Sequence, residues 1–154
     1  MKRFHFSLQA LYQVKMTKKD KAQADYAAAR AAMDQAIVKK AQILDQLDQG
    51  GRNHRKKMMS GITLPELQAY ANYFDDLRKS AEEAEGDIVK RRKIADRRQA
   101  ELVEFYRELK LLEGLREKQY QAYLKEENAK EAKELENLLA FNAANGMDTE
   151  YLNK

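Results

Sequence analysis

A heptad repeat in the second half of the chain constrains the fold more than any other feature of the sequence. Seven consecutive heptads run from Leu67 to Leu112, and twelve of their fourteen a and d positions are apolar, where an apolar content of 44% would supply about six. A repeat this strict predicts a left-handed coiled coil, because an isolated amphipathic helix would drift away from it. The a positions are Leu67, Phe74, Ala81, Ile88, Ala95, Leu102 and Leu109, and the d positions are Tyr70, Leu77, Ala84, Arg91, Arg98, Phe105 and Leu112.

A less regular apolar pattern precedes the repeat and predicts a partner helix. Residues 4–49 carry apolar side chains at steps of mostly three and four, and alanine dominates the middle of this stretch. Small residues on both sides would let two helices approach closely. We therefore expect an all-α fold, a long antiparallel two-helix coiled coil (helical hairpin) with an overhanging C-terminal helix.

Glycine and proline mark the turn between the two arms. Residues 50–62 contain three glycines and a run of Arg and Lys without helical periodicity, which predicts a basic loop. Thr63 is placed as an N-cap with Glu66 three residues later, and Pro65 lies in the first turn, where its missing N–H is tolerated. The second helix is thus expected to begin at residue 63.

The two expected arms differ in length. The arm 4–49 would be a rod of about 70 Å and the arm 63–141 one of about 115 Å, at about 1.5 Å per residue. We expect residues 1–141 to form a single coiled-coil rod and residues 142–154 to be a disordered tail. Apolar residues beyond Leu112, including Leu135, Leu138 and Leu139, would then lack an intramolecular partner.

A loop over 50–62 predicts a specific register between the arms. Facing residues would have numbers that sum to roughly 113, so that Ala29 lies opposite Ala84. The same register places Arg91 near Ala22, with Asp20 and Asp25 one turn to either side. We expect the two arginines of the repeat, Arg91 and Arg98, to set the register, at some cost in stability.

The composition excludes several classes of chemistry. The chain has no cysteine, which excludes a thiol nucleophile, a disulfide scaffold and Cys-based metal sites. Its two histidines, His5 and His54, are too few for a His-rich metal site, and neither Glu-x-x-His nor His-Glu-x-x-His occurs. We therefore expect a protein that is not an enzyme, with no catalytic, cofactor-binding or metal-binding residues.

Charge is distributed unevenly along the chain. Residues 1–62 carry 13 basic and 5 acidic side chains, residues 63–112 carry 10 and 11, and residues 113–154 carry 6 and 9, so the net charge of +4 combines +8, −1 and −3. A second basic cluster spans residues 90–98. It is most simply a solvated helix face, and because aromatic residues are not interleaved with it, no nucleic-acid partner is expected.

The sequence also indicates whether the chain could span or enter a membrane. No run of about 18 apolar residues occurs, and the Met1-Lys2-Arg3 start is not followed by a hydrophobic stretch. We expect a cytoplasmic protein with no membrane insertion.

Two segments near the ends of the sequence carry a further pattern. The first is Phe4-His5-Phe6-Ser7-Leu8-Gln9-Ala10-Leu11, followed by a basic segment over 15–21. The second is Leu111-Leu112-Glu113-Gly114-Leu115-Arg116-Glu117-Lys118, followed by Tyr123-Leu124-Lys125-Glu126-Glu127-Asn128. With the loop glycines and the stretch 70–77, these segments resemble the FliJ family of flagellar export proteins over residues 4–141.

The resemblance implies a component of the flagellar type III protein export apparatus. Such a protein would act as a central stalk: the end bearing both termini binds a hexameric export ATPase, the rod contacts a membrane export gate protein, and the stalk escorts export chaperones. It would lie peripherally at the cytoplasmic face of the inner membrane. The expected ATPase-binding residues are Leu115, Arg116, Lys118, Tyr120, Tyr123 and Leu124, and the expected gate-binding residues are Tyr70, Tyr73 and Leu77.

Two other functions fit the same composition. A stalk of a virulence type III secretion system would have the same fold. A coiled-coil nucleic-acid-binding or tethering protein would instead use the basic segments, and its binding would weaken steeply with salt.

Overall fold

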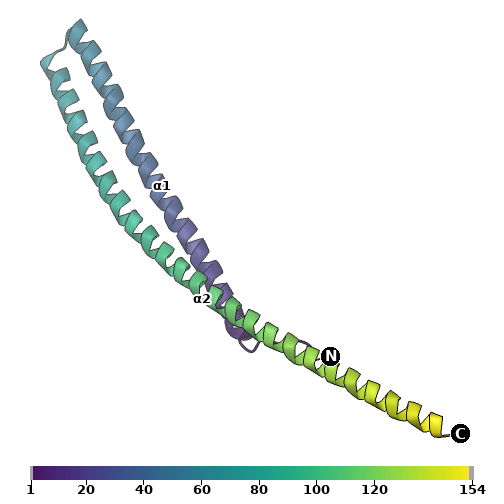
Figure 1. Ribbon diagram of the computed structural model, residues 1–154. Helices are drawn as coiled ribbons and strands as arrows, with labels where there is room; N and C mark the ends of the chain where they lie inside the picture. Colours follow the sequence, from purple (N-terminus) through teal and green to yellow (C-terminus); the bar gives the residue numbers. More distant parts are fainter. Residues whose placement is uncertain (1, 153–154) are drawn as a thin grey trace. The chain divides into compact units, whose positions relative to one another are not determined.

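The structure is a computed structural model that describes residues 2–152, with side-chain surroundings through residue 146. Two helices, α1 (Gln9–Ser60) and α2 (Leu64–Leu152), contain nearly all of these residues, and the described part of the chain has no strand (Figure 1). The chain divides into a hairpin unit, Thr17–Tyr106, and a terminal unit that joins Met1–Met16 to Arg107–Lys154. In the hairpin unit the two helices pack side by side, which confirms the predicted all-α helical hairpin.

The heptad positions of α2 line its contact with α1, as the repeat predicted. In the hairpin unit Ala84, Ile88, Ala95 and Leu102 are buried, and all the other a and d positions there except Leu67 are partly buried. The two a and d positions that end the repeat in the terminal unit are buried as well. The repeat therefore marks a real seam, which includes partly buried arginines.

α1 presents mainly small residues to this seam at seven-residue spacing. Its buried residues are Ala22, Ala36 and Gly50, and the intervening heptad positions, Ala29 and Ile43, are partly buried. Larger seam residues of α2 thus pack against alanine and glycine of α1, so the two backbones lie close together.

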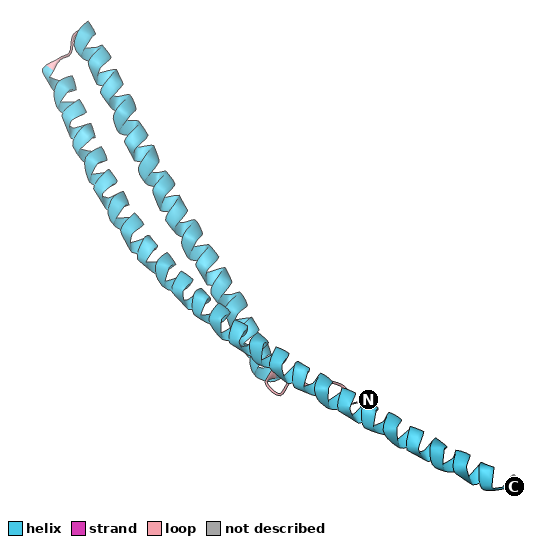
Figure 2. Cartoon of the chain, in the orientation of Figure 1, coloured by secondary structure: helices cyan, strands magenta, loops and turns pink. Residues whose placement is uncertain are grey.

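The segment predicted as a basic loop is helical, and this part of the prediction is wrong. α1 continues through Ser60, and only Gly61, Ile62 and Thr63 separate it from α2 (Figure 2). The reason is that residues 50–54 continue the seam, with Gly50 buried and Gly51 and His54 partly buried. The ring of His54 lies 4.9 Å from that of Tyr70 and 5.8 Å from that of Phe74. Such contacts offset the cost of placing glycine in a helix, which is only about 1 kcal/mol per residue relative to alanine.

The ends of the short loop have the capping chemistry that the sequence indicates. Gly61 follows the last residue of α1 with φ of 104°, the left-handed conformation that commonly ends a helix at glycine. At the start of α2 the backbone N–H of Glu66 donates to Oγ1 of Thr63 at 3.4 Å, so the predicted N-cap is confirmed.

The shorter loop shifts the register of the hairpin. Gly50 approaches Phe74, Lys40 bonds to Glu85, and Asp25 meets Arg98, pairs whose numbers sum to 124, 125 and 123. The predicted sum of 113 is therefore wrong by about 11 residues, because α1 ends at Ser60, eleven residues after the expected end of the first arm at residue 49.

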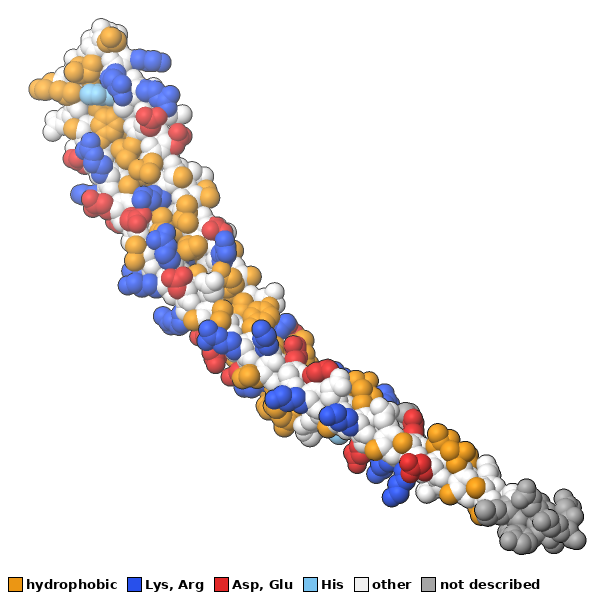
Figure 3. All heavy atoms as spheres, in the orientation of Figure 1, with side chains coloured by type: hydrophobic (Ala, Val, Ile, Leu, Met, Phe, Trp, Pro, Cys, Tyr) orange, Lys and Arg blue, Asp and Glu red, His pale blue; other side chains and the backbone are white. Residues whose placement is uncertain are grey.

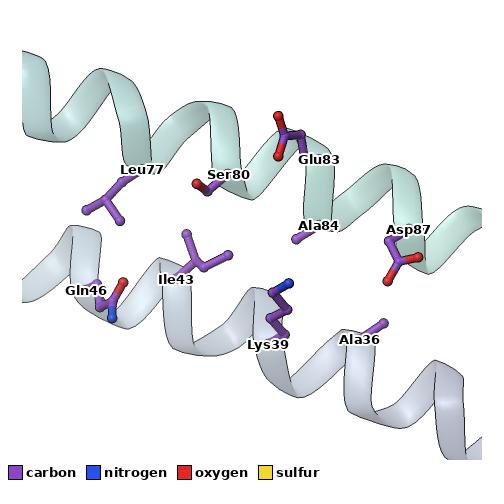
Figure 4. Close-up of a pocket in the computed structure, with 9 residues that line it drawn as sticks. All are labelled: Ala36, Lys39, Ile43, Gln46, Leu77, Ser80, Glu83, Ala84 and Asp87. Carbon is purple, nitrogen blue, oxygen red and sulfur yellow. The ribbon is translucent and has the colours of Figure 1, made fainter.

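The close-up in Figure 4 shows the same register within the hairpin. Ala36 and Ile43 of α1 line a shared hollow with Leu77 and Ala84 of α2. In that view Ala84 lies across from Lys39 and Ala36, and the expected partner Ala29 is not among the residues that line the hollow. The predicted pairing of Ala29 with Ala84 is therefore wrong.

Both termini of the rod differ from the sequence-based boundaries. The first helix begins at Gln9 and not at residue 4, and it is continuous through the basic segment 15–21. α2 continues through Leu152, so the disordered tail expected over residues 142–154 is contradicted for 142–152, and residues 153–154 lie outside the described residues. Gly146 is too weak a breaker to end the helix by itself.

The register can be tested with introduced cysteine pairs, since the natural chain has none. Ala29 lies three heptads before Gly50 and Ala95 lies three heptads after Phe74, so the two alanines should face each other in the antiparallel hairpin. The pair Ala29→Cys with Ala95→Cys should therefore join within one chain through a short bifunctional thiol reagent. The matched pair Ala29→Cys with Ala84→Cys is offset by about 16 Å along the helix axis and should not. Efficient joining of the second pair, measured by mobility on denaturing gels and mass spectrometry, would contradict the register.

Two neighbouring glycines test how closely the helices approach. A methyl group added at Gly51 meets nothing within 4 Å, so Gly51→Ala should raise the free energy of unfolding by up to about 1 kcal/mol. At Gly50 the added carbon would lie 3.0 Å from the rings of Tyr73 and Phe74, so Gly50→Ala should unfold at lower temperature than Gly51→Ala. Equal stabilisation in thermal and urea unfolding would show that Gly50 is not a packing residue.

Candidate partner-binding surfaces

The N-terminal segment of the terminal unit packs against α2. Phe6 is 4% exposed, and the ring of Phe4 lies 5.2 Å from that of Tyr120 and 5.4 Å from that of Tyr123. The guanidinium carbon of Arg116 lies 5.8 Å from the centre of the Phe4 ring. Aromatic and cation–π contacts of this kind each contribute on the order of 1 kcal/mol.

Hydrogen bonds fasten the same segment to α2. The hydroxyl of Tyr123 donates to the backbone oxygen of Lys2, and the amide of Gln119 donates to Oγ of Ser7 at 2.9 Å. One turn into α1, the hydroxyl of Tyr12 donates to Oε1 of Glu113 at 3.2 Å. The N-terminal segment is therefore held along α2 at several points.

Three of the predicted ATPase-binding residues already contact another part of this chain. Arg116, Tyr120 and Tyr123 contact Phe4, so the expectation that apolar residues beyond Leu112 lack an intramolecular partner is wrong for the two tyrosines. The two aromatic residues of the opening Phe-x-Phe motif are the signal in the sequence from which this packing could have been predicted.

The other predicted ATPase-binding residues have different surroundings. Leu124 is partly buried, whereas Leu115 and Lys118 are exposed. Leu115 and Lys118 belong to an open hollow on α2 whose centre is apolar and whose rim is basic, and Leu111 at its centre is 71% exposed. The hollow is lined by Arg107, Lys110, Leu111, Gly114, Leu115 and Lys118.

The last described turns of α2 form a second exposed surface. Every side chain from residue 128 to residue 146 is exposed. Four large apolar side chains in this stretch are each more than half exposed, and glutamates lie among them. We refer to these four residues as the distal apolar set: Leu135, Leu138, Leu139 and Phe141. Apolar residues clustered in this way are typical of a surface that binds a partner.

At the loop end of the hairpin unit, the predicted gate-binding residues differ in accessibility. Tyr73 is exposed, whereas Tyr70 and Leu77 are partly buried. Leu77 points toward α1 in Figure 4, and Tyr70 packs on His54. Tyr73 is therefore the predicted gate-binding residue that a partner reaches most easily.

The two arginines predicted to set the register behave differently. Nε of Arg91 pairs with Asp87 on its own helix at 3.0 Å, whereas the predicted register placed Asp20 and Asp25 of the first arm within its reach. Arg98 reaches Asp25 of α1 at 3.9 Å and also pairs with Glu101 at 3.2 Å. Of the two, Arg98 is the one whose ion pair joins the helices.

A lysine–glutamate pair also joins the two helices of the hairpin. Nζ of Lys40 donates a hydrogen bond to Oε2 of Glu85 at 2.6 Å. This hydrogen bond and the charge of Lys40 lower the pKa of Glu85 below its usual value, and Arg92 adds a smaller effect in the same direction. The pair is solvated, so it contributes to the choice of register more than to stability.

Candidate catalytic and metal-binding groupings were sought as well. In the described part of the chain, no three His, Asp or Glu side chains gather in an arrangement that could hold a metal ion. Among the same residues, no helix is both long enough and apolar enough to cross a bilayer.

Comparison with known proteins decides the family. The family described as flagellar FliJ protein matches residues 4–147. The chain belongs to the FliJ family. A flagellar FliJ protein of Bacillus subtilis (strain 168) is 24% identical over 135 residues, which cover 88% of this chain and 92% of that relative. No solved structure matches the chain.

Membership of the FliJ family makes the chain a component of flagellar protein export, and the family is a non-catalytic one. The matched residues 4–147 include all of the predicted ATPase-binding residues and all of the predicted gate-binding residues. The resemblance noted from the two end segments is thus confirmed.

The Lys40–Glu85 pair predicts a pH effect in this FliJ family member. Because the folded-state pKa of Glu85 is lowered, its stabilising effect is present above the unfolded-state pKa and is lost as pH falls through the folded-state pKa. Lys40→Gln should move the pKa of Glu85 up to its usual range, measured by carboxyl-carbon NMR, and Arg92→Gln should move it less. A pKa of Glu85 unchanged in Lys40→Gln would contradict the pairing.

Proposed function

We propose that this chain is the central stalk of the flagellar export machinery. It binds the hexameric export ATPase through its terminal unit, contacts the membrane export gate protein through the loop end of the hairpin, and escorts export chaperones. It works peripherally at the cytoplasmic face of the inner membrane. The proposal contains no catalytic step, and any effect on ATP hydrolysis is exerted on the partner's subunits.

The observation that carries the proposal is the distal apolar set on α2. Its four residues are each more than half exposed, in a stretch of α2 from residue 128 to residue 146 in which every side chain is exposed. A single helix with exposed leucines suits insertion into a ring, because the surrounding subunits would bury it from several sides at once.

The packing of the N-terminal segment refines which residues would contact the ring. Tyr120 and Tyr123 are held against Phe4, so they support the shape of the terminal unit. Leu115 and Lys118, on the open hollow, and the distal apolar set are the residues available to a partner. We therefore assign ring contact to these two surfaces.

Stimulation of ATP hydrolysis by the cognate export ATPase tests the proposal. A variant with Leu135→Ser, Leu138→Ser and Leu139→Ser should need at least about tenfold more protein for half-maximal stimulation, as expected when buried leucines act as hot spots. The matched control, Val38→Ser with Leu44→Ser, changes exposed residues of the hairpin unit and should stimulate normally.

A further variant separates the two proposed contacts. Tyr73→Ala should stimulate the ATPase normally and lose capture by the cytoplasmic part of the export gate protein, whereas the distal variant should do the reverse. Normal stimulation by the distal variant, or equal loss in the Val38 control, would refute the proposed ring contact. Substitutions are preferable to removal of residues 113–154, because truncation would also remove the residues on which Phe4 packs.

A further inference from the structure

The loop end of the hairpin carries exposed apolar side chains on both sides of the turn. Met59, at the end of α1, is 91% exposed, and Leu64, at the start of α2, is 76% exposed. Met58 and Leu67 beside them are exposed as well. We call these four residues the apolar apex. Four large apolar side chains gathered at one end of a helix pair are costly to leave in water, so they point to a binding role.

A group of cations lies immediately behind the apolar apex on α1. Arg52, Arg55, Lys56 and Lys57 are all exposed, and no acidic residue occurs between Asp48 and Glu66. We call these four cations the basic collar. Orange apolar and blue basic side chains are seen together at this end in Figure 3.

Part of the basic collar is available to an anionic partner. Arg52 pairs with Asp48, and Nζ of Lys57 lies 3.6 Å from Glu66. Arg55 and Lys56 form no ion pair with an acidic residue of the described chain. Arg55 is five residues from the end of α1, or about 7.5 Å along the axis, which is within a Debye length of about 8 Å at physiological ionic strength. A surface that touches the apolar apex therefore also attracts these cations.

We propose that the apolar apex and the basic collar dock the hairpin on an anionic lipid bilayer. Apolar side chains would enter the interface between headgroups and acyl chains, and the cations would bind anionic headgroups, as in other interfacial anchors. The polar backbone of Gly61, Ile62 and Thr63 limits the depth, since its groups need water or headgroups as partners. This docking would be shallow and would need no helix that crosses the bilayer. The expectation of no membrane insertion would then apply only to segments that span the membrane.

The form of the apex favours a bilayer over an acidic protein. Met59 projects with almost no protein around it, so a protein partner would have to supply the whole wall of a pocket for it. A bilayer interface accepts such a projection without a preformed pocket, and its anionic headgroups complement the basic collar over a broad area. The inference does not depend on the proposed stalk function, because it requires only this chain and lipid.

The absence of tryptophan from the chain allows a direct test with the full-length protein. Met59→Trp should shift its fluorescence to the blue on vesicles of phosphatidylcholine with phosphatidylglycerol, and not on phosphatidylcholine alone. Val38→Trp, at a 55% exposed position in the middle of α1, is the matched control and should not shift on either vesicle.

Sedimentation with the same vesicles separates the contributions of the two groups. Met58→Asp with Met59→Asp should abolish most of the binding. Arg55→Gln with Lys56→Gln should weaken it roughly fivefold for each charge removed at low salt. Lys90→Gln with Lys93→Gln removes the same charge from the mid-rod cluster and should bind like the parent protein. Far-UV circular dichroism checks that each variant keeps its helices.

Three results would overturn the proposal. The first is that the parent protein fails to bind anionic vesicles at low salt. The second is that tryptophan at positions 59 and 38 shows equal blue shifts, and the third is that the collar and mid-rod charge variants weaken binding equally. Capture of an acidic protein without vesicle binding would assign the surface to that partner instead. None of these results would affect stimulation of the export ATPase, so the two proposals fail independently.

Discussion

The close contact of small residues of α1 with the heptad residues of α2 is the constraint on which the rest of the structure depends. The buried residues of α1 are Ala22, Ala36 and Gly50, which are separated from one another by two heptads. The seam therefore repeats along both helices. Gly50 shows how near the backbones come, since a methyl group there would lie 3.0 Å from the rings of Tyr73 and Phe74 and would require them to shift. Because a seven-residue slip would keep the periodicity but lose these fits, side-chain size together with pairs such as Lys40–Glu85 selects one register.

The terminal unit solves a different problem, the stabilisation of a helix that has no full-length partner. Phe4 holds the N-terminal segment on α2 through its aromatic contacts, and Phe6 of the same segment is buried, so this segment takes the place of the seam that the hairpin unit has. Beyond this contact α2 is solvated on all sides through residue 146. The terminal unit therefore offers partners two surfaces with exposed apolar side chains, the open hollow that includes Leu111 and Leu115 and the solvated helix that carries the distal apolar set.

The fold was predictable from sequence, because a heptad repeat reports directly on helix–helix contact. The N-cap at Thr63 was predictable for a similar reason, since it depends on residues four apart or fewer. The basic loop was not, because the two glycines at 50 and 51 have the same local signal whether they end a helix or let another helix approach. That single misassignment displaced the predicted register by 11 residues and with it the partners expected for Ala84 and Arg91.

The sequence by itself determined the fold class, the seam on α2, the absence of cysteine chemistry and the family resemblance, all of which depend on composition or on spacing within one segment. The tertiary structure alone decided the register, the role of Gly50 and the accessibility of the candidate binding residues. Each of these depends on pairs far apart in the chain, such as Phe4 with Tyr123 or Asp25 with Arg98. Exposure is a property of what packs against a residue, and for Tyr123 that neighbour lies more than one hundred residues away.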